Sequence, residues 1–338
     1  MLPISVLDLA HVPEGSTPAD ALRNTLELAR HVETLGYERF WLAEHHNMVG
    51  IASAATSVVI GYVAAHTTKI RVGAGGIMLP NHSPMVIAEQ FGTLATLFPG
   101  RIDLGLGRAP GTDQRTLRAL RRDPNSADTF PQDVLELQAL LGPVQPGQVV
   151  QAVPGSDTNV PLWILGSSLF GAQLAAMLGL PYGFASHFAP DALMQALQVY
   201  RAKFQPSPQL SKPYAIVGVN VFLADTDLEA QYLFTSVQQT FANMFRGARG
   251  KLPAPIDDIE TYWSPMEKMQ AERMLACSFV GSADTVTEKL NRFLAQTGAD
   301  ELMVASAMHD PAARQRSYSM LSEIRPALNP STALFKAS

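Results

Sequence analysis

The sequence has almost none of the features that build a disulfide framework, a membrane span or a secretion signal. Cys277 is the single cysteine among 338 residues, which excludes an internal disulfide and is consistent with a reducing compartment. No apolar run reaches the length of a transmembrane helix, because polar residues or turns interrupt each one. Residues 1–15 contain neither a basic leader nor a cleavable apolar core, so no secretory signal is expected. These absences predict a cytoplasmic protein with no membrane partner.

Charge is also scarce. Charged residues make up 16% of the chain, and the formal net charge is −5. The densest basic cluster, RALRR at 118–122, is short and is interpreted as a solvated face, so no nucleic-acid partner is predicted. Hydrophobic residues make up 47% of the chain, enough for a large core. The length alone fits either two domains or one large α/β domain.

Apolar runs that are mostly unalternating recur along the chain and predict buried parallel strands. Most are separated by segments with apolar residues at helical spacing, such as Leu22, Leu26, Ala29 and Val32. Eight such βα units favour a closed (β/α)₈ TIM barrel that forms a single domain over residues 1–338. An open doubly wound sheet is the alternative. The predicted strands cover 4–9, 39–44, 70–79, 101–107, 162–165, 182–186, 214–224 and 301–306.

Two connections are too long for plain crossovers between strands. They span about 108–160 and about 225–300. We interpret both as insertions that carry extra helices at the C-terminal mouth of the barrel.

Polar and glycine residues collect where the predicted strands end, which is where barrels of this kind place their chemistry. A ring of functional side chains around an apolar barrel is therefore expected. Its members, in strand order, are Asp8; Glu44, His45, His46 and Asn47; Gly75 and Gly76; Gly107 and Arg108; Gly166, Ser167 and Ser168; Ser186 and His187.

The stretch WLAEHHNMVG (41–50) raises the choice between a metal site, proton chemistry and a surface turn. Adjacent histidines on an extended segment point to opposite faces, so His45 and His46 are not expected to chelate one ion. The sequence also has neither a His-Glu-x-x-His motif nor a cysteine pair. We therefore predict no metal site. His45 shares the face of Trp41 and Ala43 and is the better candidate for a site role, whereas His46 is interpreted as structural.

Two further segments indicate an anion site. GLGRAPG (105–111) misses the dinucleotide-binding spacing, but Arg108 at a strand end is a ready partner for phosphate, or alternatively a surface ion pair. In LGSSLF (165–170), Gly166, Ser167 and Ser168 turn a strand into a helix, which exposes backbone N–H groups at a positive helix end. An ordinary serine cap is the other interpretation of this turn. Together with Arg108, the turn favours phosphate.

Three glycines interrupt the strand in VGAGGIMLP (72–80). Glycine weakens a strand but allows close approach of a ligand to the backbone. A flat ring system lying against Gly75 and Gly76 would explain the pattern, and close helix packing is the alternative.

Taken together, AEHHN (43–47), GGIMLPNHSPMVIAEQFGTLATLFPGRIDLGLGRAPGTD (75–113), the GSS turn and VGSADTVTEKL (280–290) resemble the bacterial luciferase-like flavin monooxygenases, closest to the alkanal-monooxygenase-like branch. The resemblance covers essentially the whole chain. It implies a (β/α)₈ barrel that uses reduced FMN, supplied by a separate NAD(P)H:flavin reductase, together with O₂ and a small organic substrate.

The resemblance also implies roles for individual residues. His45 matches the catalytic histidine of the family, and Glu44 matches the adjoining glutamate of the flavin pocket. Gly75 and Gly76 match a non-prolyl cis peptide beneath the isoalloxazine ring. The phosphate-binding positions of the family fall on Arg108, Ser167 and Ser168.

At two positions the chain departs from the family. Gly107 stands where luciferase has a reactive cysteine, and His187 stands where it has an active-site tryptophan. Both positions belong to the expected substrate pocket, so neither light emission nor a long-chain aldehyde substrate is inferred. In the family the second and third helices form a dimer interface, which implies a homodimer with Glu89 near the interface.

The sequence therefore predicts an FMN-dependent monooxygenase or oxidoreductase that acts on a small organic molecule, such as an aldehyde. Two alternatives remain open. One is hydride transfer with the deazaflavin F420 in the same fold, and the other is a flavin-binding protein without catalysis.

Overall fold

The computed structural model describes residues 1–109, 113–123 and 125–329, in which strands and helices alternate along the chain. The strands are β1 (Ile4–Asp8), β2 (Arg39–Leu42), β3 (Arg71–Met78), β4 (Ile102–Gly107), β5 (Leu162–Gly166), β6 (Tyr182–Phe184), β7 (Ala215–Leu223), β8 (Ser278–Gly281) and β9 (Glu301–Ala305). The helices are α1 (Pro18–Thr34), α2 (Thr56–Ala65), α3 (Pro84–Leu97), α4 (Gln114–Ala119), α5 (Phe130–Leu141), α6 (Leu169–Leu178), α7 (Leu193–Lys203), α8 (Asp227–Phe245), α9 (Pro265–Met274), α10 (Ala283–Thr297) and α11 (Pro311–Ile324).

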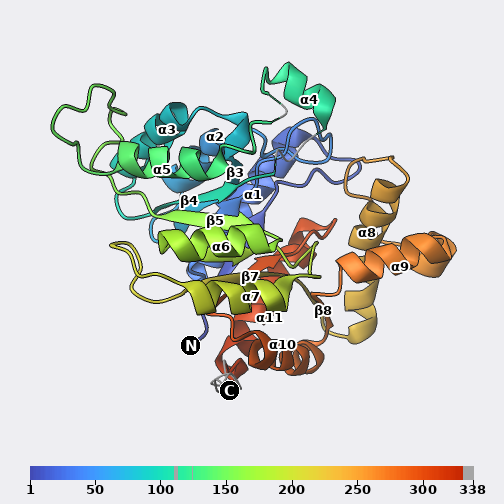
Figure 1. Ribbon diagram of the computed structural model, residues 1–338. Coiled ribbons are helices and arrows are strands. Elements are labelled where there is room, and N and C mark those ends of the chain that lie inside the picture. The colour runs from blue at the N-terminus through green and yellow to red at the C-terminus, as the bar shows by residue number, and fades with distance from the viewer. Residues whose placement is uncertain (110–112, 124, 330–338) are drawn as a thin grey trace.

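Parallel pairing closes eight of these strands into a ring (Figure 1). The strands β1 to β6 pair in chain order, β6 pairs with β7, β7 with β9, and β9 returns to β1. This closure confirms the predicted (β/α)₈ barrel and rules out the open doubly wound sheet. The eight predicted strands correspond to β1–β7 and β9.

The sequence prediction missed β8, which pairs with β7 outside the ring. Strand β7 is nine residues long, and its first part, Ile216–Asn220, pairs with β9. Its last part, Asn220–Leu223, extends beyond the ring and pairs with Ser278–Gly281. A four-residue strand is too short to give a periodic pattern, which explains why it was not found.

Each of the two long connections contains helices of its own. Helices α4 and α5 lie within 108–160, and α8, α9, β8 and α10 lie within 225–300. Figure 1 shows α8 and α9 (orange) to one side of the barrel. Between these two helices the chain returns to the loop that follows β1, where the Leu252 N–H donates to the Val12 carbonyl at 2.9 Å and the Glu14 N–H donates to the Leu252 carbonyl at 2.8 Å.

Helix α1 shows how local sequence sets the element boundaries. Thr17 and Asp20 form a capping box, and Pro18 occupies the first turn, where its missing N–H costs nothing. The apolar face of α1 packs on the barrel, with Leu26, Leu28, Ala29 and Val32 buried. An apolar layer of this kind surrounds the ring and separates it from the helices.

The inside of the barrel is divided into an apolar layer and a charged layer. The apolar layer consists of Leu7, Trp41, Ala43, Trp163, Ile216 and Met303. The ring centroids of Trp41 and Trp163 lie 5.2 Å apart in an edge-to-face arrangement. A side chain at Gly73 would place its Cβ 2.9 Å from the Trp41 Nε1 atom, so this glycine makes room for the indole.

Arg39 is at the centre of the charged layer. Its guanidinium donates to Asp103 Oδ2 and to Glu301 Oε1, each at 2.9 Å, and it lies 4.7 Å from the centroid of the Trp163 ring. Both carboxylates are fully buried and receive further donors, among them the Trp41 Nε1–H on Asp103 at 3.1 Å and the Tyr214 hydroxyl on Glu301 at 2.7 Å. These contacts connect β2, β4 and β9 across the barrel interior.

In the described ranges, no helix is long and apolar enough to cross a membrane.

Replacement of Arg39 should destabilise the barrel strongly. Arg39→Ala removes this cation from buried Glu301 and leaves Asp103 paired with Arg71, and the uncompensated charge costs on the order of 3–5 kcal/mol of unfolding free energy. Urea denaturation would measure the loss. Arg273→Ala is the control, because the Arg273–Asp191 pair is exposed and should contribute less than about 1 kcal/mol. Similar losses in the two variants would contradict the role of Arg39.

Candidate functional site

The predicted site residues lie on neighbouring strands and form an arc along one part of the barrel mouth. Glu44 and His45 follow β2, Gly75 and Gly76 lie in β3, and Gly107 ends β4. Because β2 to β6 pair side by side in this order, the next positions of the arc come from the ends of β5 and β6. Those positions are Gly166, Ser167 and Ser168, followed by Ser186 and His187.

Glu44 joins the ends of β2 and β3. Its backbone N–H donates to the Gly76 carbonyl at 3.3 Å, and its Oε2 accepts the Met78 N–H at 2.9 Å. The side chain is 1% exposed. Burial opposes ionisation of the carboxyl, but the hydrogen bonds from His46 and His82 outweigh it and lower the pKa of Glu44 to about 2. Glu44 is therefore a buried, fully ionised carboxylate at neutral pH.

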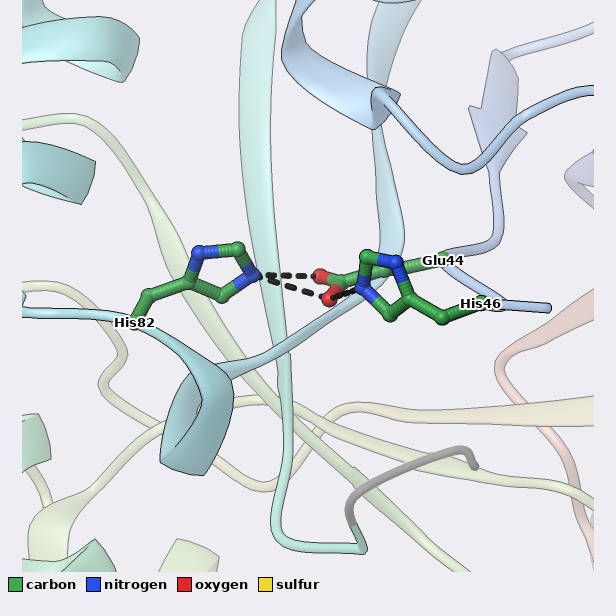
Figure 2. Close-up of side chains that lie close together, drawn as sticks. All are labelled: Glu44, His46 and His82. Atoms are coloured by element: carbon green, nitrogen blue, oxygen red, sulfur yellow. Dashed lines mark hydrogen bonds and ion pairs between the residues drawn. The ribbon is translucent and has the colours of Figure 1, made fainter. Parts of the chain in front are cut away.

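Two histidines meet on this carboxylate (Figure 2). The Nε2 atoms of His46 and His82 lie 2.6 and 2.8 Å from Glu44 Oε1. The bond to Glu44 raises the pKa of His46. The sequence pattern predicts a structural His46, and it gives no signal for His82. Strand alternation indicates that Glu44 and His46 can meet, because residues two apart share a face. No local pattern indicates that His82 joins them.

His45 lies on the other side of this segment. Its charge acts on His11 and on His187. The divergence of His45 and His46 is therefore as predicted. Burial, with a smaller contribution from His45, lowers the pKa of His187 to about 4. Burial and the charge of Arg314 lower the pKa of His11 to about 4 as well. Both histidines are neutral at pH 7.

His187 is held by its backbone and by the strand beside it. The Asn220 Nδ2–H donates to the His187 carbonyl at 2.6 Å, and the imidazole packs edge-on against Phe188. A Cβ at Gly218 would lie 2.5 Å from the His187 Nδ1 atom, so the glycine in β7 makes space for the ring.

Asp8, at the end of β1, belongs to a separate buried cluster. Its carboxylate accepts the Thr25 hydroxyl at 2.6 Å and the Arg314 guanidinium at 2.9 Å. Burial opposes ionisation, but Arg314 and Thr25 outweigh it and lower the pKa of Asp8. Since each of these groups is engaged within the cluster, Asp8 serves to fix α1 and α11 at the barrel end.

Gly75 and Gly76 form the cis peptide bond that the resemblance implied. A Cβ at Gly75 would lie 2.6 Å from the Leu7 side chain, and a Cβ at Gly76 would lie 2.7 Å from the Gly105 carbonyl oxygen. The backbone at these two positions is therefore packed closely on the side where side chains would project. Gly107 is tight for a related reason, because its Cβ would lie 2.9 Å from the Met78 sulfur.

Arg108 and the turn after β5 lie together, as the sequence suggested. The Arg108 guanidinium lies 4.1 Å from the centroid of the Phe170 ring, in the first turn of α6. Ser168 is the N-cap residue of α6, yet its side chain makes no capping hydrogen bond, and a Cβ at Gly166 would meet nothing within 4 Å. The uncapped helix end, the open space and the exposed guanidinium together suit an anion.

A cleft of about 390 Å³ adjoins the Glu44 cluster on the side of α2 and α3. Glu44, His46 and His82 line one wall. The start of α2, including Thr56, Ser57 and Val58, and Gln90 of α3 also line the cleft.

Comparison with known proteins assigns this arrangement to a family. Residues 2–301 match the family model described as luciferase-like monooxygenase. A protein of Escherichia coli K12 named luciferase-like monooxygenase is 54% identical over 325 residues, which cover 96% of this chain and 97% of that protein. The N-acetyl-S-alkylcysteine monooxygenase of Bacillus subtilis is 31% identical over 96% of this chain and 98% of its own length.

Solved structures show the same fold. The crystal structure of apo-MsnO8 is 38% identical and has a TM-score of 0.89, covering 98% of this chain and 100% of that one. More distant structures have TM-scores of 0.72 and 0.69 at 19% and 18% identity. The first is the oxygenating constituent of 3,6-diketocamphane monooxygenase from Pseudomonas putida in complex with FMN. The second is an F420-dependent secondary alcohol dehydrogenase. Each match covers 97% of this chain and 99% of the other chain.

The lowered pKa of His187 predicts a pH dependence of stability. An unfolded histidine titrates near 6.5, whereas folded His187 titrates near 4, so between these values the unfolded chain binds more protons. Stability should therefore fall as the pH is lowered from about 6.5 to about 4, by roughly 3 kcal/mol for this residue. His187→Gln should flatten that part of the curve in urea denaturation, with the exposed His66→Gln as the control. An unchanged slope in His187→Gln would contradict the assignment.

Proposed function

This chain belongs to the luciferase-like monooxygenase family, and we propose that it is an FMN-dependent monooxygenase that uses reduced flavin and O₂ to oxidise a small organic substrate. In the balanced reaction, FMNH₂ supplies two electrons, one oxygen atom of O₂ enters the substrate, and the other leaves as water. The flavin supplies the oxygen chemistry when it is bound. The residues of this chain bind it, exclude water and handle protons.

The observation that carries the proposal is the anion corner formed by Arg108 and the start of α6. An FMN phosphate placed there would receive N–H groups from an uncapped helix end and a charge-assisted bond from Arg108. Gly166 leaves the space open. Strand β5 pairs with β4, and β4 pairs with β3. In β3, Gly75 and Gly76 have no side chains, so a flat ring could lie against their backbone.

His45 is the proposed proton-handling residue. It follows β2, beside the backbone of Gly75 and Gly76, and its charge is felt by His11 and His187. Imidazole is the side chain that enzymes use most often for general acid–base catalysis. Glu44 fixes the segment that carries His45, because its carboxylate is bonded to the backbone of Met78. His187 and Gly107 are proposed to line the substrate pocket.

Hydride transfer with F420 is the second candidate, because one structural neighbour is an F420-dependent alcohol dehydrogenase. A flavin-binding protein without catalysis is the third, since barrels of this type can lose their chemistry. Monooxygenation is favoured over both because relatives at 54% and 31% identity carry monooxygenase names. The sulfur-containing substrate named for the second relative supports a small organic substrate here.

We further propose that the chain is a cytoplasmic homodimer served by a separate NAD(P)H:flavin reductase. Exposed apolar side chains on α2 and α3 support the dimer, among them Val58 (70% exposed), Tyr62, Val86 and Leu97. A pairing of these helices between two copies would bury them, and light scattering of the purified chain tests it.

Arg108→Ala should weaken FMN binding selectively. The guanidinium is proposed to contact the phosphate, so its loss should cost about tenfold in affinity for FMN and leave riboflavin binding unchanged. Flavin-fluorescence titrations with FMN, riboflavin and F420 would measure this, with Arg273→Ala as the control. Equal losses for FMN and riboflavin would place the phosphate elsewhere, and tighter binding of F420 than FMN would favour hydride transfer.

His45→Ala should abolish oxygen transfer but keep the flavin. The test supplies FMNH₂ and ¹⁸O₂ with probe substrates of two classes, an N-acetylated S-alkylcysteine and an alkanal, and measures ¹⁸O in the product by mass spectrometry. The wild type should incorporate one ¹⁸O atom. His45→Ala should lose at least about 100-fold in rate, as expected for a general acid–base group, with FMN affinity unchanged. Equal rates in wild type and variant would contradict the role of His45.

A further inference from the structure

The cluster of Glu44, His46 and His82 has the composition of a metal site. One carboxylate oxygen and two imidazole nitrogens, all within 4.8 Å of one another, come from three different positions of the barrel end. We propose that these three residues bind a divalent transition-metal ion, with Zn²⁺ as the representative. This inference goes beyond the proposed flavin chemistry and does not depend on it.

The geometry of the three ligand atoms favours one common centre. His46 Nε2 and His82 Nε2 both point at Glu44 Oε1, at 2.6 and 2.8 Å (Figure 2). In each imidazole, the nitrogen that would bind a metal therefore points at the carboxylate. Zinc bonds of about 2.0–2.2 Å in a tetrahedron separate ligand atoms by about 3.3 Å. An outward shift of roughly half an ångström by the two partly exposed rings would accommodate the ion.

The other carboxylate oxygen of Glu44, Oε2, holds the carboxylate to the end of β3. It accepts the Met78 N–H at 2.9 Å and also lies 3.0 Å from His82 Nε2. A hydrogen bond of this kind orients a ligating carboxylate. Glu44 can thus bind metal through Oε1 while its bond to the end of β3 stays in place.

The cleft explains how an ion reaches the cluster and what completes its coordination. It opens on the side of α2 and α3, and Glu44, His46 and His82 form one of its walls. Three protein ligands leave one position of a tetrahedral ion free, and that position faces the cleft, where water can fill it. Two histidines and one carboxylate with an open position are a ligand set that suits Zn²⁺ and related ions.

Isothermal titration calorimetry with ZnCl₂ tests the proposal, on tag-free protein that has been treated with EDTA and freed of flavin. The wild type should bind one Zn²⁺ per chain. His82→Ala and His46→Ala should each weaken binding by at least 100-fold, and His66→Ala, which removes an exposed histidine at the far end of α2, should leave it unchanged. Zinc should also raise the Tm of the wild type and not that of the two cluster variants.

Two results would overturn the metal site. One is the absence of stoichiometric Zn²⁺ binding to the wild type, and the other is equal affinity in the wild type and the His46→Ala/His82→Ala double variant. Circular dichroism of the metal-free variants checks that they are folded. If His82→Ala were unfolded, His82→Gln would keep the size and a hydrogen-bond donor while removing the imidazole, and the same loss of binding is expected. Because no flavin is present, failure of the flavin proposal would leave these results unaffected.

Discussion

The barrel depends on one buried cation that two carboxylates share. Arg39 lies between Asp103 and Glu301 in the barrel interior, where an unpaired charge would cost several kcal/mol. The arrangement is tolerated because each carboxylate receives additional donors, including Trp41 and Tyr214. A slip in strand register would separate Arg39 from Asp103 and Glu301 and leave buried charges without partners. The charged layer therefore fixes how β2, β4 and β9 sit relative to one another, and with them the positions of the residues at their ends.

The barrel mouth repeats the principle of a buried carboxylate with several donors, but with different partners. Glu44 joins the end of β2 to β3 through Met78 and accepts His46 and His82, whereas the interior layer uses arginine. Arginine keeps its proton at any pH at which the protein folds, while imidazole can release its proton and bind other ligands. The interior layer is consequently permanent, and the cluster at the mouth is chemically adjustable. This difference places adaptable chemistry at the end where the cleft opens.

The features that could be predicted from the sequence are those encoded by residues close together in the chain. Unbroken apolar runs identified all eight ring strands, and the GSS turn and Arg108 were correctly expected to lie together, since neighbouring parallel strands bring their ends to one edge. Strand alternation separated His45 from His46. The prediction missed β8, because four residues carry no periodicity, and it overlooked His82, because its meeting with Glu44 depends on the path of the chain after β3.

The sequence by itself determined the barrel, the family to which the chain is similar and the strand ends at which the candidate site residues lie, because these follow from patterns a few residues long. Only the tertiary structure decided which polar groups share a centre. The orientation of Glu44 toward Met78 and His82 is set by contacts between residues 34 and 38 positions apart. Such contacts depend on the path of the chain between distant positions, which no local pattern encodes.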